Sequence, residues 1–289
     1  MTNGQTLKFS YEFFPPRTSA MTRRLWRAVG QLERLNPEFF SMTYGALGSD
    51  QRISVESAIA LQEESPVPVA AHLTCAGATR DEIDSVARKL HRAGFNRIVA
   101  LRGDSANQAS PGNAYNGAAE LVEGLRRIAD FDISVAAYPE VHPRASSAAA
   151  DLEYLKRKLD AGANRAITQF FFDADCFLRF RDRAARIGIE KPVIPGILPI
   201  HNFNKVSSFS QRCGASLPGF YQELFDKTVD DQQAQYRLSV DLAVELCERL
   251  VREGAGQIHL YTLNQTDMCL DISLALGANV SSLQMSSAA

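Results

Sequence analysis

Residues 79–101, TRDEIDSVARKLHRAGFNRIVAL, contain a helix, a turn and a strand in succession, and this unit decides the fold. Thr79 with Glu82 is the capping-box pattern that begins a helix. One face of the predicted helix is apolar and consists of Ile83, Val86, Ala87 and Leu90. Gly94 is suited to end the helix. The strand after it is apolar at nearly every position, which is typical of a parallel sheet covered on both faces.

The same unit recurs at residues 146–169, SSAAADLEYLKRKLDAGANRAITQ, where Gly162 again ends the helix. The inward face of this helix is predicted to consist of Leu152, Leu155 and Leu159. Both copies join helix to strand through Ala-Gly-x-Asn-Arg, and residues 186–196 and 252–262 carry looser versions of that joint. Strands that alternate with helices predict right-handed βαβ units and a parallel sheet.

Eight apolar runs are predicted to be strands, which is the number that closes a (β/α)8 TIM barrel. The runs lie at residues 7–14, 38–45, 67–74, 96–103, 132–139, 164–172, 192–198 and 257–264. An open doubly wound sheet is the competing fold, but it normally binds a dinucleotide through a glycine-rich first turn. The first turn here, FFPPRTS at residues 13–19, contains no glycine. We therefore predict a barrel that forms a single domain over residues 1–289, with a frayed Ser/Ala tail from about residue 280.

The composition is typical of a globular protein, with 45% hydrophobic and 22% charged residues. A net charge of −2 does not indicate the excess of positive charge that is typical of nucleic-acid-binding proteins. The N-terminus lacks the apolar segment of a signal peptide, and no apolar run approaches the roughly 18 residues that cross a bilayer. The five cysteines lack metal-binding spacing, which favours free thiols in a reducing cytoplasm. We therefore expect a cytoplasmic protein that binds neither nucleic acid nor membrane.

In a TIM barrel the active site lies at the carboxyl ends of the strands. The polar residues at the predicted strand ends are Glu12, Thr43, Tyr44, His72, Thr74, Arg102, Asp104, Tyr138, His142, Gln169, Tyr261 and Asn264. Glu12 is the leading candidate for a catalytic residue, since an aromatic pocket raises the pKa of a carboxyl group, which can then act as a general acid near neutral pH. Its aromatic neighbours in the sequence are Tyr11, Phe13 and Phe14. The alternative is a glutamate that faces solvent from an edge strand.

Asp104 is a second carboxylate in a different setting. Such a pair suits a division of roles, in which one carboxyl group acts as the acid and the other stabilises charge, although a role as a helix N-cap explains Asp104 equally well. Arg102 could pair with Asp104 or hold a phosphate. Gln169 lies in ITQFFF, where a primary amide must find hydrogen-bond partners, and a ligand with donors and acceptors would provide them. Arg157 and Lys158 are typical of a solvated helix face.

Of the five histidines, His72 and His142 are placed at strand ends and the others on helices or loops. No pair has metal-binding spacing, so we expect no metal site. The sequence also lacks a GxGxxG turn, a Walker loop, a GxSxG elbow and a Cys/His nucleophile pair. Two carboxylates, an amide and several aromatic side chains remain, and this set suits a flat heteroaromatic ligand.

Eight motifs, in order from about residue 9 to residue 277, carry a family resemblance. They are YEFFPPRTS, TYGA, HLTC, ALRGD, DISVAAYPEVHP, DAGANRAITQFFFD, PGILPI and LYTLN. Together they resemble the flavin-dependent methylenetetrahydrofolate reductases, in the short bacterial form that has no C-terminal regulatory domain. The resemblance implies a (β/α)8 barrel, in agreement with the prediction from the strand pattern.

The resemblance further implies a ping-pong reaction on FAD. NADH, or less often NADPH, reduces the flavin and leaves, and 5,10-methylenetetrahydrofolate then takes its place. Flavin N5 passes a hydride to the one-carbon unit of the folate, which gives 5-methyltetrahydrofolate. The general acid of the family, the glutamate of EFFPP that helps to open the imidazolidine ring, falls on Glu12. The aspartate of LRGD, which tunes the flavin, falls on Asp104, and the folate-contacting glutamine of TQFFF falls on Gln169.

The resemblance also assigns the remaining site positions. The flavin-binding positions are Thr43, Tyr44, Ala46, His72, Leu101, Arg102, Gly103, Asp104, Ala136, Tyr138, His142, Asp151, Arg157 and Lys158. The folate-site positions are Glu12, Gln169, Lys205, Phe209, Tyr261, Leu263 and Gln265. On this basis Arg157 and Lys158 are phosphate partners rather than a free helix face. The family also implies a homo-oligomer, either a dimer or a tetramer.

The chain departs from the family pattern at the edges of both sites. Gln265 stands in place of an arginine, which removes a bidentate partner for an anion, and Lys205 stands in place of a glutamine. Tyr154 replaces a flavin-site asparagine. Residues 51–54 read QRIS where Arg-x-Arg-Thr is usual, and the usual Tyr-Ala is disturbed around residues 115–119.

Two rival functions make different demands on these residues. A flavin-free folate-using barrel, which catalyses tetrahydrofolate-dependent methyl transfer or demethylation, would have no need of LRGD and the Arg157–Lys158 pair, and both are present. A non-catalytic folate- or flavin-binding relative would have no need of Glu12 and Asp104, and both are intact. The sequence therefore favours the reductase.

Overall fold

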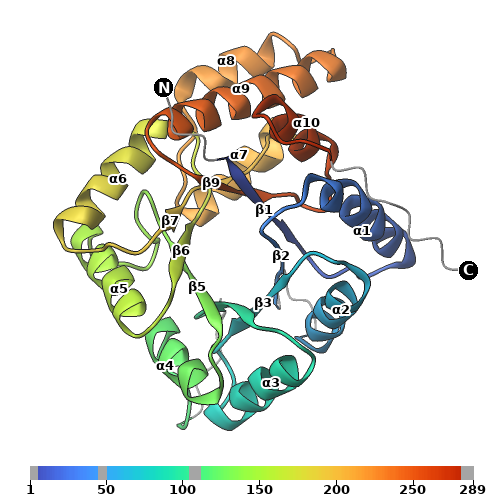
Figure 1. The fold of residues 1–289 in the computed structure, drawn as a ribbon. Helices are drawn as coiled ribbons and strands as arrows, with labels where there is room; N and C mark the ends of the chain where they lie inside the picture. The colour runs from blue at the N-terminus through green and yellow to red at the C-terminus, as the bar shows by residue number, and fades with distance from the viewer. Residues whose placement is uncertain (1–5, 45–50, 104–111, 281–289) are drawn as a thin grey trace, which may run out of the picture.

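The computed structural model describes residues 6–44, 51–103 and 112–280. Its strands are parallel and form a barrel with the order β7-β6-β5-β4-β3-β2-β1-β9-β8 (Figure 1). The strands are β1 (Lys8–Phe13), β2 (Phe39–Met42), β3 (Val69–Thr74), β4 (Arg97–Leu101), β5 (Asp132–Ala137), β6 (Arg165–Thr168), β7 (Val193–Ile194), β8 (Gly196–Ile197) and β9 (Gln257–Tyr261). The predicted TIM barrel is confirmed.

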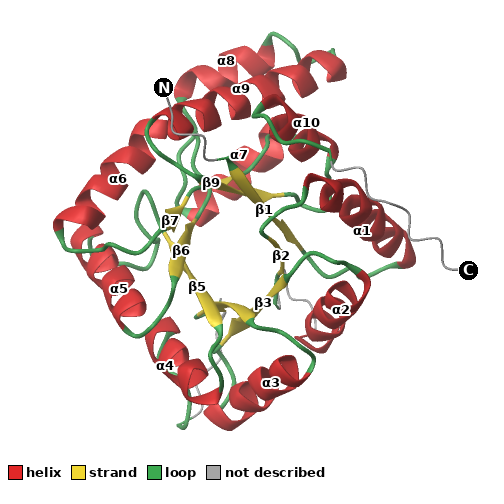
Figure 2. Ribbon diagram, in the orientation of Figure 1, coloured by secondary structure: helices red, strands yellow, loops and turns green. Residues whose placement is uncertain are grey.

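Helices surround the barrel and cover its outer face (Figure 2). They are α1 (Ser19–Leu32), the 3-10 turn η1 (Glu33–Leu35), α2 (Gln51–Glu64), α3 (Arg80–Arg92), α4 (Ala118–Ile128), α5 (Ala148–Asp160), α6 (Ala174–Arg186), α7 (Phe203–Cys213), α8 (Gly219–Asp226), α9 (Gln232–Arg252) and α10 (Asp267–Ala275). The capping box predicted before α3 is confirmed, because Glu82 N–H donates to Thr79 Oγ1 and Thr79 N–H donates to the Glu82 carboxylate. The predicted inward face of α5 is buried as well.

The barrel closes at a place where the predicted strand over residues 192–198 is in fact two short strands. Pro195 has no N–H to donate to a ladder, and it separates β7, which pairs with β6, from β8, which pairs with β9. Pro195 O accepts the His259 N–H at 2.9 Å, and Gly196 N–H donates to Thr168 Oγ1 at 2.9 Å. A side chain thus completes the closure between β8 and β6.

Gly196 is required at this closure by close packing. A Cβ atom there would lie 2.2 Å from Thr168 O and 2.7 Å from Cε2 of Tyr261. Tyr261 also donates its hydroxyl to Thr168 O at 2.7 Å. The absence of a side chain at Gly196 therefore leaves room for the Tyr261 ring to pass from β9 to β6 where the barrel closes.

Successive residues of each strand face opposite sides of the barrel wall. The outward residues of β1, which pack in the large cluster shared with the helices, are Phe9, Tyr11 and Phe13. The register places Ser10 and Glu12 on the inner side, beside β9. The middle of the barrel is filled by an apolar plug of Phe39, Ala70, Val99, Ile167 and Ile194.

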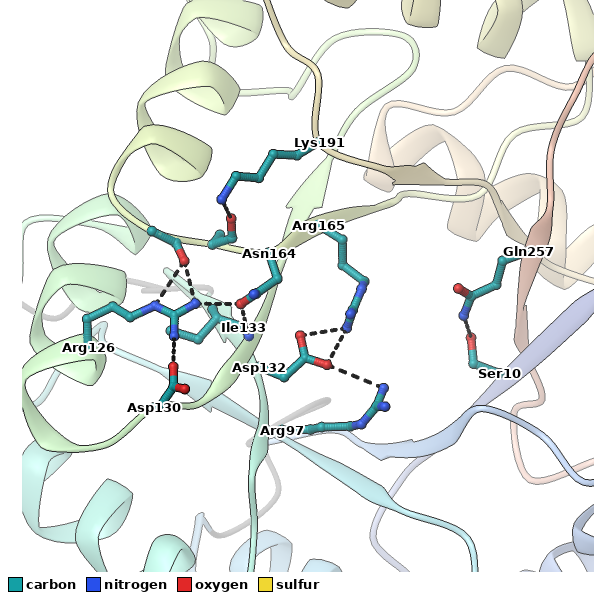
Figure 3. A network of polar contacts seen from close by, with 12 residues as sticks. Ser10, Arg97, Arg126, Asp130, Asp132, Ile133, Asn164, Arg165, Lys191 and Gln257 are labelled. Carbon is teal, nitrogen blue, oxygen red and sulfur yellow. Dashed lines mark hydrogen bonds and ion pairs between the residues drawn. The ribbon is translucent and has the colours of Figure 1, made fainter.

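Charged residues close the end of the barrel at which the strands begin (Figure 3). Arg165 Nη1 lies 2.9 Å from both carboxylate oxygens of Asp132, and Arg97 Nη1 lies 3.5 Å from Asp132 Oδ2. At the start of β1, Lys8 Nζ pairs with Glu38 Oε1 at 2.7 Å. We call these five residues the floor. The carboxyl ends of the strands form the opposite end, where polar groups of another kind gather.

Candidate functional site at the mouth of the barrel

The Glu12 carboxylate lies inside the end of the barrel between two imidazoles. Oε2 is 3.4 Å from Nε2 of His72 on β3 and 3.8 Å from Nε2 of His259 on β9. The Glu12 side chain is 19% exposed, so it remains open to the outside. Burial lowers the pKa of His72, although the neighbouring Glu12 acts in the opposite direction, so His72 is neutral near pH 7.

Two expectations about this region are wrong. Glu12 does not lie in a pocket of Tyr11 and Phe13, because neighbours along a strand face opposite sides and these rings pack outward. His259 is not on a helix or loop but inside β9, where it is 1% exposed. The signal for His259 was available, since strand alternation puts it on the same face as Tyr261.

Three buried polar atoms near the strand ends have no hydrogen-bond partner among the described residues. They are Ser41 Oγ, Thr43 Oγ1 and His72 Nε2. Ser41 is the register partner of Glu12 on the neighbouring strand β2. Buried polar atoms are normally paired, and the exceptions are characteristic of sites that receive a ligand or water. We call Glu12, Ser41, Thr43, His72 and Tyr261 the mouth.

An aromatic row leads from Glu12 to helix α7. Tyr261 is the register partner of Glu12, and its ring meets that of Phe170 edge-on at 6.1 Å. Phe170 in turn stacks on Phe209 of α7 at 5.4 Å. Burial raises the pKa of Tyr261 well above its ordinary value, and the charge of Glu12 adds to the effect, so the phenol keeps its proton. The row therefore offers a flat ligand an aromatic surface next to a carboxylate.

Gln169 and Leu263 lie beside this row. Gln169 follows β6, and its side-chain Oε1 accepts the N–H of Phe170 at 3.1 Å, so the amide has found a partner in its own loop. Leu263 packs against the same aromatic cluster and has a left-handed backbone, with φ of 49°. Both predicted positions thus reach the aromatic row.

The loop after β9 holds the end of β1 through Asn264, whose role the sequence did not reveal. Asn264 Oδ1 accepts the Phe14 N–H at 3.0 Å, and Asn264 Nδ2 donates to Phe14 O at 2.8 Å. Thr262 Oγ1 donates to the backbone oxygen of Glu12 at 2.7 Å. These bonds fix the backbone from the Glu12 carbonyl to Phe14, directly after the Glu12 side chain.

The end of β4 is fixed by contacts with the β3 loop. The backbone oxygen of Arg102 accepts the N–H of Cys75 at 3.2 Å and that of Ala76 at 2.8 Å. Gly103 has φ of 84°, and a Cβ atom there would lie 2.8 Å from Cβ of Thr74. Leu101 is the register partner of Thr74. This close approach shapes a backbone cradle at the position expected to bind the flavin.

On the next strand, residues from β5 and α5 form a buried polar group. Lys158 is buried and its Nζ donates to Ala136 O. Burial lowers the pKa of Lys158 to about 8, against the opposing charge of Asp151. Asp151 Oδ2 accepts the His142 N–H at 2.9 Å, and the rings of His142 and Tyr138 meet edge-on at 4.5 Å. Residues that the resemblance assigns to flavin binding therefore lie together at the end of β5 and on α5.

Tyr154, the departure on α5, lies between α4 and the two cations of α5. Its ring centre is 4.9 Å from Arg157 Cζ and 5.3 Å from Lys158 Nζ. Its hydroxyl lies against Gly117, where a Cβ atom would come within 2.3 Å of it. Tyr115, by contrast, points away from the mouth, because its hydroxyl donates to Asp84 of α3 at 2.7 Å.

Three of the remaining predicted residues lie at the periphery of the site. Lys205 in the first turn of α7 and Gln265 in the loop after β9 are exposed, as is Arg157. Tyr44 directly follows Thr43 after β2 and is buried. Ala46 and Asp104 lie outside the described residues, as does most of the predicted frayed tail.

Within residues 6–44, 51–103 and 112–280, no three His, Cys, Asp or Glu side chains are placed to hold a metal ion. Across the same part of the chain, the helices are too short or too polar to cross a membrane.

A closed parallel barrel with its unpaired polar groups at the carboxyl ends of the strands is the arrangement found in TIM-barrel enzymes. The sequence profile of the methylenetetrahydrofolate reductase family matches residues 1–277. The chain belongs to this family.

Individual relatives agree with the assignment. The 5,10-methylenetetrahydrofolate reductase of Escherichia coli strain K12 is 46% identical over 272 residues, which cover 94% of this chain and 91% of that protein. The enzyme of Pectobacterium carotovorum subsp. carotovorum is 43% identical over 272 residues, with coverages of 94% and 90%. A methylenetetrahydrofolate reductase (NADH) of Zea mays is 34% identical, and the match covers 93% of this chain but 48% of that protein.

A solved structure supports the fold alone. It is an uncharacterized protein from Clostridium thermocellum that binds two copies of 5-methyl-5,6,7,8-tetrahydrofolic acid. It matches with a TM-score of 0.64 at 16% identity and covers 94% of each chain.

Proposed function

We propose that this protein reduces 5,10-methylenetetrahydrofolate to 5-methyltetrahydrofolate, with NADH as the hydride source and FAD as the resident cofactor. The observation that carries the proposal is the Glu12 carboxylate, held inside the mouth between His72 and His259. Next to it, buried oxygen and nitrogen atoms lack a hydrogen-bond partner among the described residues, as expected of a surface that receives a heteroaromatic ligand. Family membership supplies the identity of that ligand.

The residues present fit a flavin dinucleotide. The unpaired atoms of Thr43 and His72 suit a ring system with donors and acceptors, and the cradle at Gly103 allows close backbone approach. Lys158, with Arg157 and Tyr154 beside it, suits phosphates and a second ring system. FAD, when bound, supplies the redox chemistry, because it accepts a hydride from one substrate and returns it to the next.

Glu12 is proposed as the general acid. Its proton would pass to a ring nitrogen of methylenetetrahydrofolate, the bond from that nitrogen to the bridging carbon would break, and an electrophilic iminium carbon would remain. The ionised Glu12 then faces the His259 ring, and its carbonyl is held by Thr262 while the neighbouring Phe14 is held by Asn264. A fixed backbone limits the freedom of the carboxyl group, which keeps it in position for proton transfer.

The aromatic row is proposed to orient both substrates in turn. Phe209 is half-buried and stacks on the buried Phe170 ring at 5.4 Å with an interplanar angle of 26°, which fixes the orientation of the Phe209 ring as an aromatic surface. Nicotinamide and pterin rings are both flat and would compete for such a surface. A shared surface is consistent with a ping-pong order, in which one substrate must leave before the other binds. Asp104 is retained as the proposed electrostatic partner on sequence grounds.

The test is an absorption spectrum of the purified protein, followed by anaerobic addition of NADH. The expected result is a flavin band near about 450 nm that bleaches with NADH and recovers on addition of methylenetetrahydrofolate. A protein that is colourless, takes up no added FAD and does not oxidise NADH would overturn the proposal and would favour a flavin-free folate enzyme. A flavin that bleaches but does not recover with the folate would favour a non-catalytic relative.

A further inference from the structure

Three polar side chains form a line inside the barrel on the floor side of Glu12. Gln257 Nε2 donates to Ser10 Oγ at 3.3 Å, and Ser10 Oγ lies 2.8 Å from His259 Nδ1. The other ring nitrogen, His259 Nε2, lies 3.8 Å from Glu12 Oε2. Ser10 and His259 are essentially buried, with exposures of 0% and 1%. Nothing in the proposed reaction requires this line, yet it ends at the proposed acid.

The chemistry of the three groups gives the line a direction. An amide nitrogen donates hydrogen bonds and does not accept them, so Ser10 Oγ acts as acceptor toward Gln257. Ser10 Oγ is buried, and among the described residues its hydrogen-bonding contacts are Gln257 and His259 alone. We therefore assign the Ser10 hydroxyl hydrogen to His259 Nδ1, which accepts it through a lone pair. A neutral imidazole carries one hydrogen, and here that hydrogen is left on Nε2, the nitrogen that faces Glu12.

We infer that Ser10 and Gln257 are positioning residues that hold His259 in its Nε2–H tautomer, and that His259 thereby stabilises the ionised form of Glu12. The catalytic consequence rests on the proposed function, whereas the tautomer does not. At 3.8 Å the contact is too long for a hydrogen bond in this structure, but an N–H at that position directs a positive dipole at the carboxylate. Catalytic contacts of this kind often shorten when substrate binds.

The other groups that face His259 leave this assignment intact. The ring of Phe39 on β2 stacks on it at 5.9 Å, and that of Tyr261 meets it edge-on at 5.2 Å. His72 and Tyr261 both stay neutral near pH 7, for burial lowers the pKa of one and raises that of the other. The charged groups on the floor side are those of Lys8, Glu38, Arg97, Asp132 and Arg165.

The direct test is 15N NMR of the histidine-labelled full-length protein, with the His259 signals identified by their loss in His259→Gln. At about pH 8 we expect hydrogen on Nε2 and none on Nδ1. Hydrogen on Nδ1 in the unaltered protein would overturn the inference. The measurement needs neither flavin nor folate, so it stands or fails separately from the proposed reaction.

Gln257→Glu is the sharpest variant, because it replaces the donor by an acceptor of the same size. A carboxylate at this position accepts from the Ser10 hydroxyl, and Ser10 Oγ must then accept a hydrogen from His259 Nδ1. We expect Nδ1 to gain hydrogen in Gln257→Glu and to lose it again in the double variant Ser10→Ala/Gln257→Glu, which keeps the new charge but breaks the line. An unchanged Nδ1 in Gln257→Glu would show that the line does not control the tautomer.

The kinetic counterpart is the pH profile of the folate half-reaction. In Gln257→Glu the carboxylate of Glu12 loses a favourable dipole, so the pH profile should move toward higher pH. Ser134→Ala, a buried inward-facing serine on β5, is the matched control and should leave the profile in place. Equal profiles for the unaltered protein and Gln257→Glu would refute the catalytic part of the inference, even with the tautomer as expected.

Discussion

At the floor of the barrel, Asp132 forms ion pairs with Arg97 and Arg165, whereas at the mouth the Ser41 and Thr43 hydroxyls are buried without a hydrogen-bond partner in the described structure. The floor groups lie at the starts of β4, β5 and β6, the two hydroxyls lie at the end of β2, and the apolar plug separates the two ends. We attribute the difference to the use of each end.

A paired charge stabilises a fold or is neutral to it, whereas an unpaired buried polar atom destabilises it. The floor thus serves the folded state alone. The mouth retains groups that weaken the folded state, and such groups persist where a ligand uses them. Variants at the two ends should separate accordingly, with floor variants changing stability and mouth variants changing activity.

Glu12→Gln tests the mouth and should have the largest effect. The amide keeps the size of the side chain but cannot act as an acid, so folate reduction should fall by about 100- to 10,000-fold. Bleaching of the flavin by NADH should continue at a similar rate, as measured by stopped-flow absorbance. Glu38→Gln on the floor is the control and should leave both rates unchanged. Near-full folate turnover in Glu12→Gln would remove Glu12 from the mechanism.

Asp132→Ala tests the floor. Two guanidinium groups lose their shared carboxylate, and since the site is partly exposed, the free energy of unfolding should fall by about 1–3 kcal/mol. Urea unfolding measures this loss. Turnover per folded molecule should not change.

Asp130→Ala is the matched control for the floor. Asp130 pairs with Arg126 at 2.9 Å but is fully exposed (Figure 3), and surface ion pairs contribute little. Its stability should therefore stay close to that of the unaltered protein. A loss as large as that of Asp132→Ala would show that the barrel floor has no special role.

Lys158→Met tests a buried cation near the mouth. The pKa of Lys158 falls from 10.5 to about 8 on folding, so at pH 7 the folded state holds a charge that it disfavours. Methionine should raise the free energy of unfolding at pH 7 by about 1–2 kcal/mol and weaken FAD binding.

The pH dependence gives the sign of this effect. Between about pH 8 and 10.5 the unfolded state binds the proton more tightly than the folded state, so the stability contributed by Lys158 rises with pH. Lys158→Met should lose that rise, whereas Lys156→Met, which removes a surface pair with Asp160, should keep it. If the free energy of unfolding changed equally between pH 7 and pH 10 in the unaltered protein and in Lys158→Met, the lowered pKa of Lys158 would be contradicted.

Ser41→Ala should have the smallest effect on stability. Its hydroxyl is buried without a hydrogen-bond partner in the described part of the chain, so its removal should leave the free energy of unfolding unchanged or raise it by less than about 1 kcal/mol. Ser239→Ala is the contrast, because Ser239 Oγ donates to Ile200 O at 2.7 Å, and its loss should destabilise by about 1 kcal/mol. Weaker FAD binding in Ser41→Ala, measured by titration, would link the unpaired hydroxyl to the ligand. An equal loss of stability in both variants would argue against the unpaired state of Ser41.

Local sequence was enough to predict the repeating helix–strand unit. The capping box at Thr79 and the terminal Gly94 act within one turn of the chain, and the continuous apolar strands report burial on both faces. Eight such units imply closure, and the apolar run over residues 7–14 places Glu12 near a strand end. These inferences need only neighbours along the chain.

The tertiary structure alone decided what each inward strand residue meets across the barrel. Strand alternation, a local property, turns Tyr11 and Phe13 away from Glu12, but only the closed barrel brings Glu12 against His259, a residue 247 positions away in the chain. Pro195 divided one predicted strand, and a Thr168 side chain completed the closure. Distances across a closed barrel depend on strand register and on the shape of the whole ring, and no local pattern encodes them.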